Sequence, residues 1–133
     1  MQSLKARVGR PLQVGTFLET CDNSGAKIIQ IISVFGHNTR KGRRSAAGVG
    51  DLIMAAVVKG KADMRKKVVF AVIVRQRKEY RRPSGVRIKF EDNSAAVLKD
   101  DKGNPQGTLF KGPIAKEACD RWPGVAKVAS IIV

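Results

Sequence analysis

The longest uninterrupted apolar run of the chain is joined directly to one of its most basic segments. Residues 68–74 read VVFAVIV and contain no polar side chain, which is typical of a strand buried on both faces or facing the inside of a barrel. Residues 75–85 follow at once and read RQRKEYRRPSG, with only one acidic side chain. The fold is therefore expected to bury the first segment and to carry the second at its rim. The second segment holds five positive charges within eight residues, on Arg75, Arg77, Lys78, Arg81 and Arg82.

Several other segments have the composition of β-strands, and turn-forming residues separate them. Residues 86–90 alternate apolar and basic side chains, so we predict a strand there that forms a hairpin with residues 95–98. Short strands followed by one late helix indicate a small all-β barrel, whose closure protects the strand edges. The remaining strand-like segments span residues 12–21, 27–35 and 51–60.

The two ends of the chain differ from its centre. Residues 1–11 are basic and show no strand pattern, and we expect a tail or a strap across a surface. Near the other end, apolar side chains recur every fourth residue and predict a short helix that Pro123 ends. The residues of this helical stripe are Ile114, Ala118 and Trp122.

The length of 133 residues fits one domain. We divide it into a tail (1–11), a barrel with basic loops (12–98) and a C-terminal loop and helix region (99–133). Cys21 and Cys119 lie far apart and neither belongs to a CxxC pair, so a reduced compartment fits best, while a disulfide between them stays open. One histidine and two cysteines cannot supply a zinc site of the Cys/His type.

The net charge is the most unusual property of the chain. Lys and Arg number 26 against 11 Asp and Glu, which gives +15. Such an excess opposes compaction by self-repulsion and indicates a polyanionic partner, namely nucleic acid. Sixteen of the basic residues and three of the acids lie between residues 40 and 89, mostly in connections at 36–50, 61–67 and 75–85. If alternate loops of a barrel meet at one end, these connections converge on one surface.

We expect these basic side chains to bind phosphates, because the guanidinium fork suits bidentate contacts with phosphate oxygens. Tyr80 lies inside the cluster and either stacks on an unpaired base or packs on the barrel rim; the sequence leaves both open. His37 is interpreted as a polar loop residue. On this interpretation, replacing Arg81 and Arg82 with alanine weakens RNA binding and leaves the fold intact. The residues assigned to RNA binding are Arg40, Lys41, Arg43, Arg44, Lys59, Lys61, Arg65, Lys66, Lys67, Arg75, Arg77, Lys78, Tyr80, Arg81 and Arg82.

Other classes of function find less support. The sequence contains no complete phosphate-binding glycine motif and no clustered carboxylates, so we expect no enzyme activity, cofactor, metal or small-molecule substrate, and an RNA-modifying enzyme is a weak alternative. A membrane partner is not expected, because the longest apolar run has seven residues and the charge lies in loops. The main alternative is a free OB-like protein that binds single-stranded nucleic acid. It needs aromatic platforms, and Phe17, Phe70 and Phe90 occupy positions expected in the core.

Five motifs in order along the chain carry a resemblance to a known family. They are CDNSGAK (21–27), AGVGDLI (47–53), RKK (65–67), AVIVRQRKEYRRPSGVRIKFEDNSA (71–95) and GPIAKEACDRWP (112–123). With these motifs the chain resembles the large-subunit ribosomal protein fourteen family, and its archaeal and eukaryotic branch most closely. The long central motif is the most specific of the five. The first eleven residues lie outside the resemblance.

The resemblance implies a mainly β fold, a small five-stranded β-barrel with a projecting β-ribbon and short C-terminal helices. It implies a non-catalytic component of the large ribosomal subunit in the cytoplasm, bound to large-subunit rRNA and to small-subunit rRNA at intersubunit bridges. It further implies that the region GTLFKGPIAKEACDRW faces neighbouring large-subunit ribosomal proteins and an anti-association factor. By its pattern alone, Trp122 either anchors the C-terminal helix or contacts a partner. The residues assigned to this partner surface are Thr108, Phe110, Lys111, Lys116 and Trp122.

Overall fold

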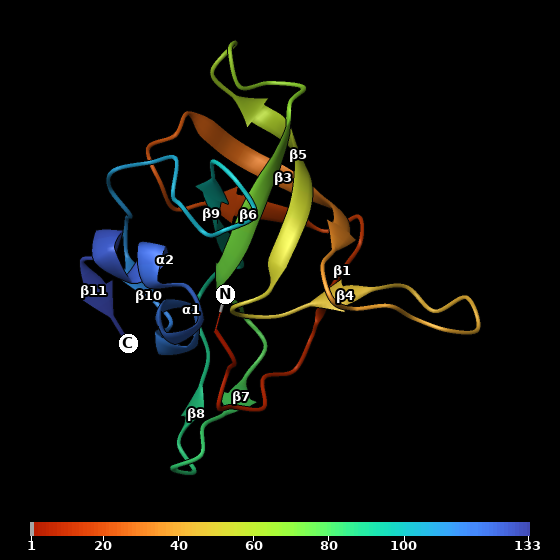
Figure 1. Cartoon of the computed structure of the whole chain (residues 1–133), viewed down its shortest axis with the longest axis vertical. Coiled ribbons are helices and arrows are strands. Elements are labelled where there is room, and N and C mark those ends of the chain that lie inside the picture. Colours follow the sequence, from red (N-terminus) through yellow and green to blue (C-terminus); the bar gives the residue numbers. More distant parts are fainter. Residues whose placement is uncertain (1) are drawn as a thin grey trace.

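Five strands close into a barrel in the order β2-β3-β5-β6-β9 (Figure 1). The computed structural model describes residues 2–133. Neighbouring barrel strands run antiparallel, except that β2 and β9 are parallel. The mainly β fold with a closed five-stranded barrel is confirmed. The barrel strands are β2 (Phe17–Thr20), β3 (Ala26–Val34), β5 (Leu52–Gly60), β6 (Val68–Arg75) and β9 (Ser94–Leu98).

Strand β6 contains the apolar run of residues 68–74, which is buried in its second half. Its first residue, Val68, is 57% exposed, whereas Ala71 to Val74 are completely buried. Alternate side chains of this half point into the barrel, and the C-terminal region covers the other face, where the Ala115 N–H donates to the Val74 carbonyl at 3.1 Å. The expectation of burial on both faces therefore holds for the second half of the strand.

The predicted hairpin between residues 86–90 and 95–98 is wrong. Strand β8 (Arg87–Ile88) pairs instead with β7 (Tyr80–Arg81), and the two form a ribbon that projects from the barrel at the bottom of Figure 1. Strand β9 is buried at every position and lies between β6 and β2, where it closes the barrel. A two-stranded ribbon with one exposed face suits the alternating basic residues of β8, and a fully buried strand needs neighbours on both edges.

The C-terminal region packs against one side of the barrel through two short helices. Helix α1 (Lys116–Arg121) starts two residues later than predicted, because Ile114 belongs to β10 (Pro113–Ile114). Pro123 ends α1 as expected but also begins α2 (Pro123–Val128), since proline at the first helical position loses no hydrogen bond. Strand β10 pairs in parallel with β11, which spans Ile131–Ile132.

The N-terminal segment runs as a strap across the surface, one of the two interpretations that the sequence left open. Within residues 2–11, which we call the strap, the Gln2 N–H donates to the Arg121 carbonyl at 2.9 Å. Further along, a Cβ atom added at Gly48 would lie 2.2 Å from the Gly9 carbonyl oxygen, so only glycine permits this close approach. The strap then leads into β1 (Leu12–Gln13), which pairs with β4 (Ala46–Ala47).

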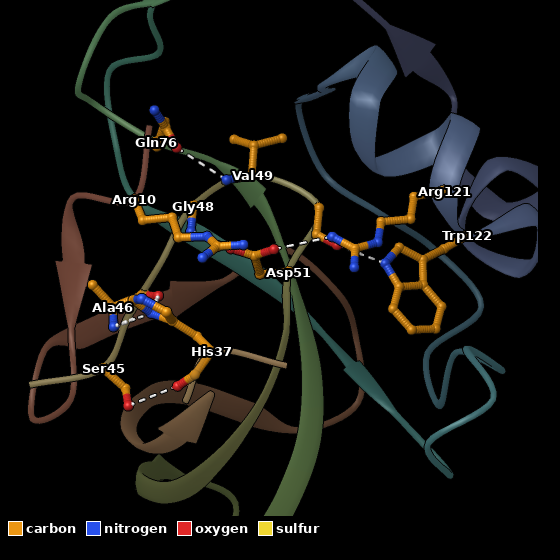
Figure 2. Close-up of polar contacts among 11 residues, drawn as sticks. Arg10, His37, Ser45, Ala46, Gly48, Val49, Asp51, Gln76, Arg121 and Trp122 are labelled. Atoms are coloured by element: carbon orange, nitrogen blue, oxygen red, sulfur yellow. Dashed lines mark hydrogen bonds and ion pairs between the residues drawn. The ribbon is translucent and has the colours of Figure 1, made fainter. Parts of the chain in front are cut away.

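Asp51 joins the strap, the barrel and helix α1 (Figure 2). Its carboxylate accepts a hydrogen bond from Arg121 of α1 at 3.0 Å and lies 3.7 Å from the Arg10 guanidinium of the strap. It also accepts the Gly48 N–H at 2.8 Å. Both segments outside the barrel are therefore fixed to the same buried carboxylate.

Candidate nucleic-acid interface

The three basic connections leave the barrel in three different directions (Figure 1). The 36–45 loop extends to the right, the 61–67 turn lies at the top, and the β7–β8 ribbon lies at the bottom, at the opposite end of the longest axis. The expected convergence on one surface is therefore wrong. Successive antiparallel strands place successive connections at opposite ends of a barrel, so the 61–67 turn must lie away from the other two.

The 36–45 loop carries four exposed basic side chains on a closed base. At the base, the Ala46 N–H donates to His37 Nδ1 at 2.9 Å, and the Ser45 hydroxyl donates to the His37 carbonyl at 3.0 Å (Figure 2). His37 is thus a loop residue, as expected, and it holds the two ends of the loop together. The exposed basic residues beyond this base are Arg40, Lys41, Arg43 and Arg44.

Two lysines adopt a backbone conformation that the sequence analysis did not predict. Lys41 has φ of 60° and Lys66 has φ of 63°, and among residues 2–133 no other non-glycine residue has positive φ. This conformation costs a lysine about 1 kcal/mol relative to an ordinary one. Both residues lie at the surface of basic connections, where strained backbone is often associated with binding. No sequence pattern marks them, apart from the glycine that follows Lys41.

The 61–67 turn presents a second group of exposed cations. The Arg65 N–H donates to the Lys61 carbonyl at 3.0 Å, which closes a single helical turn. The Lys66 N–H donates to the Val57 carbonyl at 3.1 Å and fixes the turn to β5. All the basic side chains predicted here are exposed: Lys59, Lys61, Arg65, Lys66 and Lys67.

The ribbon separates exposed basic residues from buried ones. Arg77, Lys78 and Arg81 are exposed, whereas Tyr80 is only 3% exposed. The Tyr80 hydroxyl donates to a carboxylate oxygen of Glu117 at 2.7 Å, and burial, followed by this carboxylate, raises the tyrosine pKa. The ring therefore packs between the ribbon and α1, and it offers no face on which a base can stack.

Arg82 also turns towards the protein. Its Nε donates to Glu117 at 2.8 Å, and its Nη2 donates to the Val133 carbonyl at 2.6 Å. The prediction that Arg82 contributes nothing to the fold is therefore corrected, because this side chain ties the ribbon to α1 and to the C-terminus. Arg81 is exposed and has no such contact among the described residues.

Arg75 is a structural residue rather than an exposed one. It ends β6 with 8% exposure, and its guanidinium donates to Asp92 at 2.8 Å. Nη1 donates to the carbonyls of Lys111 and Pro113, both at 2.9 Å. These contacts leave Arg75 no surface for RNA, and its assignment to RNA binding is corrected.

The predicted partner surface divides in the same way. Thr108, Lys111 and Lys116 are exposed, whereas Phe110 and Trp122 are each 1% exposed. The Trp122 indole N–H donates to the Gly50 carbonyl at 2.8 Å (Figure 2). Trp122 is thus an anchor of the C-terminal helices, one of its two interpretations, and Phe110 and Trp122 support the surface from beneath.

The aromatic side chains of the barrel strands do not all lie in the core. Phe17 is 58% exposed, so its predicted place in the core is wrong. Phe35 is also exposed and packs on the half-buried Phe70, with ring centroids 5.8 Å apart. These rings lie on the outer face because their neighbours in the strands point inward.

Buried ionisable groups explain how the fold responds to acid. Burial by itself raises the pKa of Glu117 and of Asp92, but hydrogen bonds from Arg82 and Arg75 outweigh it, so both pKa values lie below their ordinary range. A carboxyl group with a lowered folded-state pKa stabilises the fold above its unfolded pKa, which is about 4, and loses that contribution as the pH falls further.

We therefore expect the free energy of unfolding to fall as the pH decreases below about 4. Urea denaturation at pH 6, 4 and 3 measures this change. The Glu117→Gln variant is expected to have a shallower pH dependence than the wild type, because one of the two carboxylates is gone. Identical pH profiles for the two proteins would contradict the assignment to Glu117.

Cys21 and Cys119 are buried free thiols, and burial raises their pKa values to about 12 and about 11. The part of the chain that the structure describes holds no group of three metal-ligating side chains. Across residues 2–133, no helix is long and apolar enough to cross a membrane.

The chain is similar to known proteins over its whole length. The family model described as ribosomal protein L14p/L23e matches residues 11–133. The large ribosomal subunit protein uL14 of Nanoarchaeum equitans is 51% identical over 133 residues, and the uL14 proteins of Methanocella arvoryzae and Methanocorpusculum labreanum are 47% and 46% identical. Each alignment covers all of this chain and all of the relative.

Proposed function

This chain belongs to the ribosomal protein L14p/L23e family, whose members are structural ribosomal proteins rather than enzymes, and from that membership we propose that it binds large-subunit rRNA through its basic connections. The observation that carries the proposal is that exposed basic residues lie on three connections, which the closed barrel keeps apart. Phosphate contacts of this kind are strongly electrostatic and independent of base identity.

The proposed RNA contacts are the assigned residues whose side chains are exposed. Arg75 and Tyr80 are removed because they are buried, and Arg82 positions the ribbon rather than contacting RNA. The proposed contacts are Arg40, Lys41, Arg43, Arg44, Lys59, Lys61, Arg65, Lys66, Lys67, Arg77, Lys78 and Arg81.

The C-terminal region supplies a second proposed surface. Thr108, Lys111 and Lys116 are exposed there, above the buried side chains of Phe110 and Trp122. We assign this surface to neighbouring large-subunit ribosomal proteins and to an anti-association factor, and we assign part of the basic surface to bridges with small-subunit rRNA. The protein would then be located in the cytoplasm, on the ribosome.

Sedimentation of a tagged copy in a cell lysate tests the proposal directly. At low salt, the protein is expected to sediment with large subunits and whole ribosomes, and high salt is expected to release it because each phosphate contact displaces counterions. A slowly sedimenting peak without rRNA at both salt concentrations would contradict the proposal. It would favour a free single-strand binder that uses the exposed Phe17 and Phe35.

Removing two charges from the 36–45 loop gives a quantitative prediction. The Arg43→Ala/Arg44→Ala variant is expected to reduce the slope of log affinity against log salt for large-subunit rRNA by about 1 to 2, because each lost phosphate contact removes slightly less than one unit. Filter binding at several salt concentrations measures the slope. Lys127→Ala, an exposed cation on α2, is the control and should change the slope little. An unchanged slope for the double variant would exclude this loop from the interface.

A further inference from the structure

We propose that the strap and the ribbon together form a site for a phosphodiester group of RNA, held by the guanidinium groups of Arg7 and Arg81. The inference rests on the proposed rRNA binding and assigns a contact to the strap, which had no binding role in the sequence analysis. The ligand of this site is a pair of phosphate oxygens in the RNA backbone.

The site is a hollow lined by cations from two distant segments. Arg7 of the strap and Arg81, Arg82 and Pro83 of the ribbon line a volume of about 350 Å³, and no acidic residue contributes to it. Arg82 is engaged with Glu117, whereas Arg7 and Arg81 are exposed and form no ion pair with any residue that the structure describes. Two arginines without an ion pair among the described residues therefore line one open hollow.

A neighbouring hollow shows why the site is the one next to Arg7. This second hollow, of about 380 Å³, shares Arg82 and Pro83 with the first. Lys5 and Lys116 line it, but so does Asp120, whose charge offsets that of one lysine, while Glu117 offsets that of Arg82. An anion gains less there, so the charge distribution selects the hollow between Arg7 and Arg81.

The backbone segments that carry the two arginines are held in place before any ligand arrives. The strap is fixed before Arg7 by the hydrogen bond from Gln2 to α1, and after it by the contact of Gly9 with Gly48 and by the ion pair of Arg10 with Asp51. On the other side, the pairing of Arg82 with Glu117 fixes the end of β7, where the ribbon turns. A preorganised backbone loses little conformational entropy when the ligand binds.

The chemistry of the two side chains favours phosphate over other anions. A guanidinium donates two parallel hydrogen bonds that match the spacing of two phosphate oxygens, and two such groups can hold both non-bridging oxygens of one phosphodiester. Lysine offers a point charge without this geometry, so a lysine variant keeps the charge and loses the fork.

Affinity of the full-length protein for a large-subunit rRNA transcript tests the site. Arg7→Ala and Arg81→Ala are each expected to weaken binding about fivefold, and the double variant is expected to weaken it less than the product of the two, because both side chains hold one phosphate. Arg7→Lys should recover only part of the affinity. Lys127→Ala removes one exposed charge from α2 and is the matched control, with a smaller effect.

A second variant moves the strap without changing any charge. Gly48→Ala places a methyl group against the Gly9 carbonyl, so it should displace Arg7 and weaken rRNA binding to a similar extent. Adding Arg7→Ala to this variant should then have little further effect. Circular dichroism shows whether the barrel is folded in every variant compared.

Different failures separate this inference from the proposed function. If the wild type binds the transcript and Arg7→Ala weakens this binding no more than Lys127→Ala does, the proposed site is wrong while the proposed function stands. Exact multiplication of the two single effects would also overturn it, since separate phosphates are then contacted. Titration with inorganic phosphate distinguishes the source of the ligand: phosphate binding lost in Arg7→Ala without loss of rRNA affinity would overturn the assignment to RNA. A wild type that binds no rRNA overturns both.

Discussion

Replacement of Trp122 with alanine is expected to lower the free energy of unfolding by about 3–5 kcal/mol, the range for removing a large buried aromatic side chain. The indole is 1% exposed, its N–H donates to Gly50, and a Cβ atom added at Gly103 would lie 2.5 Å from the ring. Truncation therefore leaves a cavity between the C-terminal helices, the turn at Gly50 and the loop that contains Gly103, and it leaves the Gly50 carbonyl without its donor.

Urea denaturation followed by far-UV circular dichroism measures the loss, since Trp122 is the only tryptophan and its fluorescence disappears with it. Trp122→Phe keeps much of the packing and should be intermediate, which isolates the hydrogen bond. Lys127→Ala provides an exposed control. A loss below about 1 kcal/mol for Trp122→Ala would mean that the side chain is not the anchor of the C-terminal helices.

Replacement of Glu117 with alanine is expected to cost about 3 kcal/mol, because it leaves a largely buried guanidinium without its counter-charge. Glu117 and Arg82 have side-chain exposures of 5% and 18%, and the Tyr80 hydroxyl loses its acceptor in the same step. The ribbon should then separate from α1, and amide hydrogen exchange at residues 80–88 should become faster while exchange in the barrel strands changes less.

An exposed ion pair on the same ribbon is the matched control. Arg87 donates to Glu79 at 2.9 Å with both side chains open to solvent, so Glu79→Ala should cost less than about 1 kcal/mol. In a double-mutant cycle, Arg82→Ala should add much less in the Glu117→Ala background than alone. Equal losses for Glu117→Ala and Glu79→Ala would contradict the buried role of Glu117.

The barrel strands were predictable because their signal is local. Residues 27–35, 51–60 and 68–74 carry runs of β-branched residues between turns, and all three form barrel strands. The position of β9 was not predictable from proximity, because it pairs with β6 and with the distant β2 rather than with the adjacent segment. Strand β9 is buried at every position. The sign of a central strand in the sequence was its run of apolar or small side chains.

The candidate site was predictable as a set of charged segments but not residue by residue. Arg75, Arg81 and Arg82 belong to one basic cluster, yet two of them turn inward. The difference is set by Asp92 and Glu117, acids that the fold brings from 17 and 35 residues away. Composition alone cannot distinguish a cation that meets such a partner from one that does not.

On the proposed RNA-binding function, the separation of the three basic connections by a closed barrel has a kinetic consequence. Once one connection is bound, the barrel presents the other two at a high effective concentration, because no flexible linker has to be ordered. Release then requires all three contacts to open together, so residence time exceeds what any one contact gives. RNA segments bound at the two ends of the molecule would be held at a fixed spacing by the barrel while that RNA folds.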